Sequence, residues 1–350
     1  MGHYGCTALC YTVLTYHFGL GLNEDPFVAL ALGALSFKIK LSFLNKEARM
    51  KKQGEARRIY GVIPPLLTAF DAQGDFDEKA QREIVAFLVD KVHGFYICGT
   101  YGSGPLMEVD ERKRVAEVII DEVNGRIPVI VHVGTISTHS AVELAKHAER
   151  AGATAVAAVP PFYYPFKEPE VERHFKALVE SVSIPVFVYN NPRTTGVPIT
   201  PDFLGRLAGL GIAGVKDSSF DIMVFYDYLR KVNKPNFIFI IGTEALMLPA
   251  IAMGAYGAVP GLANALPEPV VELFTEIKEK GATNKARELQ LKVSAMRETV
   301  HHYGPTIPLL HAILQRRGIN AGHPRLPYVL PPKDVVDQAI DALKQLGASL

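Results

Sequence analysis

The chain has 350 residues, with 37 Lys and Arg against 36 Asp and Glu, which leaves a formal net charge of +1. Its 48% hydrophobic and 21% charged residues exclude an intrinsically disordered chain and are typical of a globular protein. The balanced charge predicts neither a nucleic-acid nor an acidic-membrane partner. A single (β/α)8 barrel needs about 250 residues, so such a fold leaves several dozen residues to be explained.

Residues 1–57 differ in character from the rest, and we interpret them as an N-terminal extension that is either not native or disordered. Their apolar run at 27–37 is far shorter than the ~20 residues that span a bilayer. At Met50 the sequence becomes polar, so our hypothesis is that Met50 is the natural start and that 1–49 is either an upstream read-through or an artificially added segment. N-terminal sequencing of the native protein tests this hypothesis.

Cysteine is scarce in the chain, which contains Cys6, Cys10 and Cys98. This small, odd number argues against a disulfide framework and for a reducing compartment, so we expect a cytoplasmic protein. Cys6 and Cys10 form one C-x3-C pair without a second pair, which is a weak metal signal.

From residue 60 onwards, apolar runs rich in β-branched residues alternate with helical patterns. The runs lack strict alternation, as expected of strands buried on both faces, and lie at 61–63, 94–98, 128–133, 155–159, 185–189, 212–215, 237–241 and 257–259. Helical patterns follow the earlier runs at 77–92, 109–123, 140–151 and 169–182. Eight such units predict a (β/α)8 TIM barrel over residues 58–267. The alternative is a doubly wound sheet, but no Gly-x-Gly-x-x-Gly follows any of these strands.

Further helical patterns follow the eighth strand, at 267–280, 284–302, 306–317 and 333–346. They predict a C-terminal helical extension over residues 268–350 that packs on the barrel.

Barrel active sites lie at the carboxyl ends of the strands, where two side chains stand out. Lys216 follows an apolar run, and burial in the barrel mouth lowers a lysine pKa and makes the neutral amine a nucleophile. Such an amine attacks a ketone to form a Schiff base. Tyr189 ends the preceding strand and is placed to transfer protons. The alternatives are an ion pair of Lys216 with Asp217 and a tyrosine that only caps the core.

The turn from Gly99 to Gly104 offers backbone N–H groups and the Thr100 hydroxyl, a combination that suits a small carboxylate. The alternative is a glycine-rich turn required only for tight geometry. The turn lacks the lysine and the spacing of a P-loop, so we do not interpret it as a nucleotide site.

Three motifs in this order, Gly99-Thr-x-Gly, Tyr189-Asn-x-Pro-x-x-x-Gly and Gly214-x-Lys-Asp-x-Ser, resemble the dihydrodipicolinate synthase / N-acetylneuraminate lyase family of pyruvate-dependent class I aldolases. The resemblance covers about residues 58–335. It implies that Lys216 forms the Schiff base with pyruvate or a 2-keto acid, without a cofactor, and that Tyr189 is the acid/base.

The resemblance also implies roles for further residues. Thr100 would connect Tyr189 to Tyr163 of a neighbouring subunit, which implies a homo-oligomer, a dimer of dimers. Backbone groups at Thr100 and Tyr101, in the turn from Gly99 to Gly102, would hold the keto acid's carboxylate, and Val259 would line the pocket.

Departures from the family pattern bear on the substrate. Tyr101 replaces a threonine of the usual motif, and Gly104-Pro105 looks like the 2-keto-3-deoxygluconate aldolase branch. Dihydrodipicolinate synthases carry an arginine where this chain has Thr194, while Arg193 stands one place earlier. Ser218 matches a sugar contact of the sialic acid lyases only in part.

We therefore carry three hypotheses: a pyruvate-releasing aldolase or related dehydratase for 2-keto-3-deoxy sugar acids, dihydrodipicolinate synthase, and a barrel that binds a 2-keto acid without turning it over. The intact catalytic set argues against the third. A metal-dependent aldolase is disfavoured because the eleven histidines are dispersed. His132, at the end of the third strand, is expected to be structural.

Overall fold

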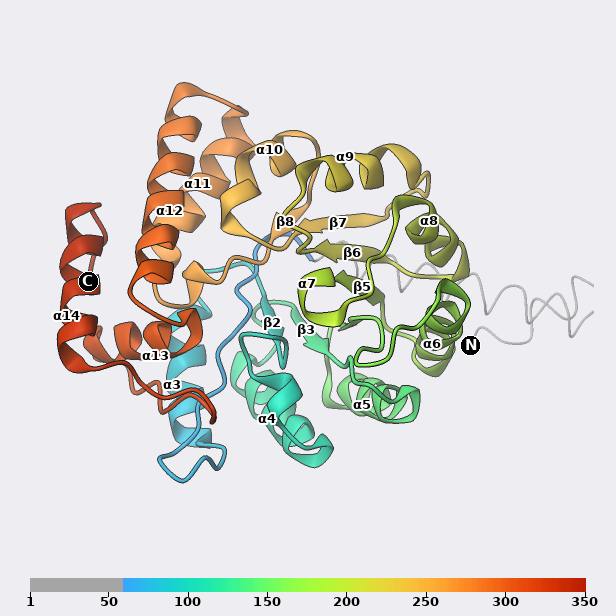
Figure 1. Cartoon of the computed structure of the whole chain (residues 1–350), viewed down its shortest axis with the longest axis horizontal. Coiled ribbons are helices and arrows are strands. Elements are labelled where there is room, and N and C mark those ends of the chain that lie inside the picture. The colour runs from blue at the N-terminus through green and yellow to red at the C-terminus, as the bar shows by residue number, and fades with distance from the viewer. Residues whose placement is uncertain (1–58) are drawn as a thin grey trace, which may run out of the picture. The chain divides into compact units, whose positions relative to one another are not determined.

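Eight parallel strands form the centre of the structure, a computed structural model that describes residues 59–350 (Figure 1). The strands are β1 (Gly61–Val62), β2 (Phe95–Ile97), β3 (Val129–His132), β4 (Ala155–Ala158), β5 (Val186–Asn190), β6 (Gly214–Asp217), β7 (Ile238–Ile241) and β8 (Gly257–Ala258). Their order is β1-β8-β7-β6-β5-β4-β3-β2, so each strand lies beside its neighbours in the sequence and β8 lies beside β1.

Backbone hydrogen bonds between the β1 and β2 segments close the ring. The N–H of His93 donates to the carbonyl of Val62 (2.9 Å), and that of Tyr96 donates to the carbonyl of Pro64 (3.0 Å). β1 is short because Pro64 and the proline after it have no N–H to donate. The closed parallel ring confirms the (β/α)8 barrel and excludes the doubly wound sheet.

Helices follow the strands around the ring: α3 (Glu78–Leu88), α4 (Val109–Val123), α5 (Thr138–Ala151), α6 (Glu168–Ser181), α8 (Pro201–Leu210), α9 (Ile222–Lys231), α10 (Met247–Ala252) and α11 (Pro267–Lys280). Caps account for two starts. Asp77 accepts from the N–H of Ala80, so α3 begins one residue after its predicted start. Ser137 accepts from the N–H of Ser140, so α5 begins two residues before its predicted start.

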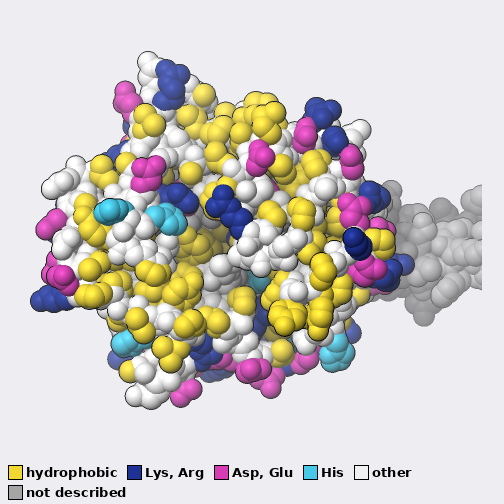
Figure 2. All heavy atoms as spheres, viewed as in Figure 1, with side chains coloured by type: hydrophobic (Ala, Val, Ile, Leu, Met, Phe, Trp, Pro, Cys, Tyr) yellow, Lys and Arg dark blue, Asp and Glu magenta, His cyan; other side chains and the backbone are white. Residues whose placement is uncertain are grey.

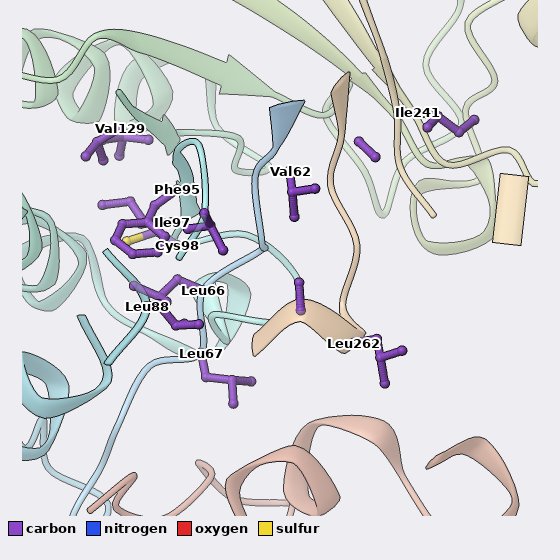
Figure 3. Close-up of a cluster of buried hydrophobic side chains, with 14 of the residues drawn as sticks. Val62, Leu66, Leu67, Leu88, Phe95, Ile97, Cys98, Val129, Ile241 and Leu262 are labelled. Carbon is purple, nitrogen blue, oxygen red and sulfur yellow. The ribbon is translucent and has the colours of Figure 1, made fainter. Parts of the chain in front are cut away.

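Two apolar clusters hold the barrel together. The inner one fills the barrel with inward side chains such as Ile130, Phe187, Tyr189 and Ile240. The outer one joins the other face of the strands to the helices. Figure 3 shows part of the outer cluster, where Phe95 and Ile97 of β2 lie close to other buried side chains. Alternation along β2 therefore leaves Tyr96, between these two residues, on the inner side.

The remaining helices, α12 (Asn284–His302), α13 (Thr306–Arg316) and α14 (Lys333–Gln345), lie with α11 on one side of the barrel (Figure 1). α11 contacts β1 and α10, which is the place of an eighth barrel helix. Arg325, in the segment before α14, forms an ion pair with Glu111 of α4 and anchors this segment to the barrel.

All described residues belong to one compact unit. The interpretation of residues 1–57, the proposed start at Met50 and the Cys6/Cys10 pair lie outside the described residues. Among the helices that the structure describes, none has the length and hydropathy needed to cross a membrane.

Candidate active site

Lys216 and Tyr189 lie side by side in the barrel interior. β5 and β6 pair with Tyr189 directly opposite Lys216, and the Nζ atom of Lys216 lies 3.8 Å from the centroid of the Tyr189 ring. Asp217 points to the other side of β6, where Asn190 Nδ2 and Ser219 Oγ donate to its carboxylate, each over 2.7 Å. The structure therefore does not support the alternative pair of Lys216 with Asp217.

Burial controls the proton affinity of Lys216, which is 4% exposed. Desolvation lowers the pKa of Lys216 below its usual value, although the charge of Tyr189 and a hydrogen bond with it oppose the shift. The lowered pKa increases the share of the neutral amine, which is the form that attacks a carbonyl carbon.

The Tyr189 hydroxyl is surrounded by polar groups. Burial alone would raise the pKa of Tyr189, but the charge of Lys216 and hydrogen bonds with Ser218, Thr100 and Lys216 outweigh it, so the pKa is lowered. Asn191 Nδ2 also donates to the hydroxyl oxygen over 3.1 Å. These contacts stabilise negative charge on the oxygen, as a proton acceptor requires.

The turn after β2 lies beside the same interior, because the Thr100 side chain forms a hydrogen bond with Tyr189. The N–H of Ser103 donates to the carbonyl of Thr100 (3.2 Å), and that of Gly104 donates to the carbonyl of Gly99 (3.0 Å). Within the described part of the chain, the N–H groups of Thr100 and Tyr101 have no acceptor. Two adjacent free donors in a tight turn are suited to bind a carboxylate.

Two glycines of this turn are required by close approaches. A Cβ at Gly99 would lie 2.8 Å from Cε1 of Tyr96, and a Cβ at Gly102 would lie 2.8 Å from the carbonyl oxygen of Leu66. The hydroxyl of Thr68 holds the turn by donating to the carbonyl of Gly102 (2.7 Å).

Tyr101 turns away from Lys216 and toward the C-terminal helices. Its ring packs against Gly261, where a Cβ would lie 2.5 Å from the Tyr101 hydroxyl. Burial and the nearby carboxylate of Glu244 raise its pKa, while a hydrogen bond with the Thr306 side chain opposes the shift. The Tyr101 hydroxyl is therefore bound away from Lys216, and any contribution to a carboxylate site falls to its backbone N–H.

The helix after β5, α7 (Pro192–Thr195), carries two of the predicted specificity residues (Figure 1). Arg193 is exposed, and its guanidinium carbon lies 4.6 Å from the centroid of the Phe220 ring. The hydroxyl of Thr194 donates to the carbonyl of Asn191 (3.2 Å). Figure 2 shows that this face of the molecule is hollowed near its centre, with basic side chains at the rim.

Two other predicted residues lie at very different depths. Val259 is buried in the inner cluster together with Tyr189. Tyr163 is 82% exposed, and its ring contacts Tyr164, with a centroid distance of 5.2 Å. Among the described residues, its hydroxyl has no partner, so one chain alone does not join Tyr163 to Thr100.

Sequence reasoning missed Tyr96, Asn191 and Glu244. Tyr96 is an inward residue of β2, and strand alternation with Phe95 and Ile97 outside is the signal that points to it. Asn191 stands at the variable position of the Tyr189-Asn-x-Pro motif, so the motif itself does not point to it. Glu244 is 4% exposed and has no such signal, because burial of a carboxylate after β7 depends on α12.

His132 is held by the backbone on both sides. Its Nδ1 lies 3.2 Å from the carbonyl oxygen of Cys98, and its Nε2 accepts from the N–H of Val159 (3.4 Å). Desolvation, with the charges of Arg112 and Lys216, holds the pKa of His132 well below its usual value, so the ring is neutral. In the region described, no three His, Cys, Asp or Glu side chains are placed to hold a metal ion.

The closed barrel and the buried Lys216–Tyr189 pair define the class of protein: a barrel enzyme with its candidate site at the carboxyl ends of the strands. The model of the Dihydrodipicolinate synthetase family matches residues 58–346, and the chain belongs to this family. This confirms the resemblance seen in the sequence.

Relatives with different activities match at similar identity. A DapA-like lyase of Halobacterium salinarum is 37% identical over 276 residues, which are 78% of this chain and 90% of that protein. The 4-hydroxy-tetrahydrodipicolinate synthase of Methanopyrus kandleri is 33% identical over 294 residues, 83% of this chain and 97% of that protein. A probable 2-dehydro-3-deoxy-D-pentonate aldolase of Escherichia coli K12 is 32% identical over 285 residues, 79% of this chain and 92% of that protein. The chain is thus a lyase-type aldolase of this family.

A solved structure has the same fold. A prophage protein of the dihydrodipicolinic acid synthase family from Escherichia coli K12, in complex with pyruvate, superposes with a TM-score of 0.79 at 25% identity. The match covers 83% of this chain and 99% of that chain.

Proposed function

We propose that this protein is a Schiff-base class I aldolase that releases pyruvate from a 2-keto-3-deoxy sugar acid. The observation that carries the proposal is the buried amine of Lys216 beside the hydroxyl of Tyr189. The likeness to a relative solved with pyruvate supports a 2-keto acid as the ligand. The reaction needs no cofactor, because the imine on Lys216 is itself the electron sink.

The first step joins the substrate to the lysine. The neutral amine of Lys216 attacks the keto carbon and a protonated imine forms. The carbonyl oxygen takes one proton from the amine nitrogen and one from the Tyr189 hydroxyl and leaves as water, which leaves Tyr189 deprotonated. The N–H groups of Thr100 and Tyr101, which have no backbone acceptor among the described residues, would hold the neighbouring carboxylate and orient the keto carbon.

The second step breaks the carbon–carbon bond. The electrons of the C3–C4 bond move into the protonated imine to give an enamine, and the C4 hydroxyl gives its proton to the Tyr189 oxygen as C4 becomes an aldehyde. The hydrogen bonds that lower the pKa of Tyr189 favour this proton acceptance. Protonation of the enamine at C3 and attack of water release pyruvate and restore the amine.

Three features favour a sugar acid over aspartate semialdehyde. Thr194 occupies the position where the synthases carry an arginine, and its hydroxyl is bound to the carbonyl of Asn191. Arg193 instead stacks on Phe220. A 32% identical relative is a probable aldolase for a 2-keto-3-deoxy acid. The synthase is the second candidate, favoured by the relative that is 33% identical.

Trapping with borohydride tests the proposal. The full chain is incubated with pyruvate, sodium borohydride reduces the imine to a secondary amine, and mass spectrometry locates the adduct. We expect one adduct on Lys216, none in Lys216→Ala, and an unchanged adduct in the control Lys278→Ala, an exposed lysine of α11. An unmodified Lys216 would refute the mechanism.

Substrate comparison separates the two candidate reactions. We expect pyruvate release from 2-keto-3-deoxy acids to be faster than condensation of pyruvate with aspartate semialdehyde. The opposite ranking would assign the synthase activity instead.

We also propose that the enzyme is cytoplasmic, because its scarce cysteines argue for a reducing compartment.

A further inference from the structure

Two aromatic rings flank the Nζ atom of Lys216. It lies 3.9 Å from the centroid of the Tyr96 ring and 3.8 Å from that of the Tyr189 ring. The two rings meet edge to face, with centroids 5.7 Å apart and an interplanar angle of 74°. The lysine nitrogen therefore lies in an aromatic cage made by Tyr96 and Tyr189.

Tyr96 reaches this place from the opposite wall. β2 and β6 are four strands apart in either direction around the ring, so the Tyr96 side chain crosses the interior to meet Lys216. Tyr96 is 1% exposed, and its hydroxyl has no hydrogen-bond partner in the described chain. Tyr96 therefore contacts Lys216 through its ring and not through its hydroxyl. Gly99 leaves space for this ring, because a Cβ at Gly99 would lie 2.8 Å from Cε1 of Tyr96.

No carboxylate of the described residues balances a charge on Nζ. Asp217 faces the other side of β6. The titratable groups that face Nζ are Tyr189 from β5, Tyr96 from β2 and, behind them, the neutral His132 from β3. The face of an aromatic ring carries negative potential, and its attraction for a cation is strongest where water is excluded.

We propose, on the basis of the proposed function, that Tyr96 is a further catalytic residue whose ring, with that of Tyr189, stabilises positive charge on Nζ, first as the ammonium and then as the protonated imine. The protonated imine is the electron sink for bond cleavage, so keeping it protonated in a buried site favours turnover. The cage supplies this stabilisation without a carboxylate that would lock the lysine in an ion pair.

The change of charge on Nζ during imine formation predicts that the contribution of the Tyr96 ring to pyruvate binding depends on pH. A ring that served only for packing would have no such dependence. Above the pKa of Lys216 the free amine is neutral, and formation of the protonated imine takes up one proton. The cage then stabilises the imine but not the free amine. Below that pKa, ammonium and imine are both cations, and the cage stabilises both. Weakening the Tyr96 ring should therefore weaken pyruvate binding at high pH and leave it nearly unchanged at low pH.

The test weakens the negative potential of the Tyr96 ring face while keeping an aromatic ring at this position. Tyr96 is replaced in the full chain by Phe and then by mono-, di- and trifluorinated phenylalanine, which progressively lose the negative potential of the ring face. The pyruvate concentration for half-maximal borohydride adduct is measured across pH. We expect Tyr96→Phe to stay within about twofold, because it loses only an unpartnered hydroxyl, and the trifluoro variant to need about tenfold more pyruvate at high pH.

The matched control is the same fluorinated series at Phe187, another buried ring of the inner cluster, which packs against Gly214. We expect no trend with fluorination there. A flat series at position 96, an equal trend at position 187, or an equal loss at low and high pH would each overturn the proposal. An unsubstituted protein that forms no adduct would refute the proposed function itself, which keeps the two failures distinct.

Discussion

At the scale of single residues, Tyr189 is expected to govern proton transfer rather than folding. Tyr189→Phe keeps the ring beside Lys216 but removes the hydroxyl that contacts Thr100, Ser218 and Asn191. General acid–base groups contribute roughly 10²–10⁴-fold to rates, so we expect kcat for pyruvate release to fall by at least about a hundredfold. Stopped-time borohydride trapping and steady-state kinetics measure the loss.

Tyr228→Phe is the matched control for this prediction. Its buried hydroxyl donates to the carbonyl of Ile199, outside the barrel interior, so its loss should lower stability slightly and leave kcat unchanged. If Tyr189→Phe lowers kcat no more than Tyr228→Phe does, Tyr189 is not the acid/base.

The sequence indicates the residue pair but not every side chain around it. Lys216 and Tyr189 end adjacent parallel strands, whose carboxyl ends meet at one end of a barrel, so their proximity follows from topology. The direction of Tyr101 and the reach of Tyr96 across the interior depend on packing against Gly261 and Gly99, which no local pattern encodes.

At the scale of elements, how well the sequence predicts the bounds of a helix depends on the length and the caps of that helix. α4 and α12, of 15 and 19 residues, have the bounds that their periodicity predicts. α7 has four residues, too few for a periodic signal, and forms because hydrogen bonds to the Asn191 carbonyl close its turn. A buried hydrogen bond also links two neighbouring strands: Asn190 of β5 donates to the carboxylate of Asp217 on β6.

This link predicts how stability depends on pH. Burial raises the pKa of Asp217 to about 6, although hydrogen bonds from Ser219 and Asn190 oppose the shift. Its pKa is higher in the folded chain than in the unfolded chain, so its contribution to stability is full below about pH 4 and is lost as the pH rises through 6. Above this pH, the raised pKa lowers the free energy of unfolding by about 3 kcal/mol at most.

Asp217→Asn removes this titration and keeps the hydrogen bond from Asn190. We expect the free energy of unfolding of the variant, relative to the unsubstituted chain, to rise between pH 4 and pH 8 by up to about 3 kcal/mol. Denaturant unfolding at several pH values measures it, with the exposed Asp90→Asn as the control for a lost charge. A difference that stays constant with pH would contradict the raised pKa.

At the scale of the whole molecule, the exposed Tyr163 suggests that the site is completed by a second copy. Tyr163 has a left-handed backbone (φ 80°), a conformation that costs a non-glycine residue about 1 kcal/mol or more. It presents its ring beside that of Tyr164, and both are exposed in one chain. We propose that these rings face a neighbouring subunit in a homo-oligomer, where the Tyr163 hydroxyl reaches Thr100 of that subunit and extends the hydrogen bonds of Tyr189.

Mixed oligomers test this arrangement. Lys216→Ala chains have no nucleophile, and Tyr163→Phe chains lack the hydroxyl that completes a neighbour's site, so each pure oligomer should be impaired. In a mixed dimer, the site that keeps Lys216 receives an intact Tyr163 from the Lys216→Ala chain. Co-expression with two affinity tags isolates this species, and we expect pyruvate release at about half the rate per chain of the unsubstituted protein. An activity no higher than the mean of the two pure variants would show that Tyr163 does not act across subunits.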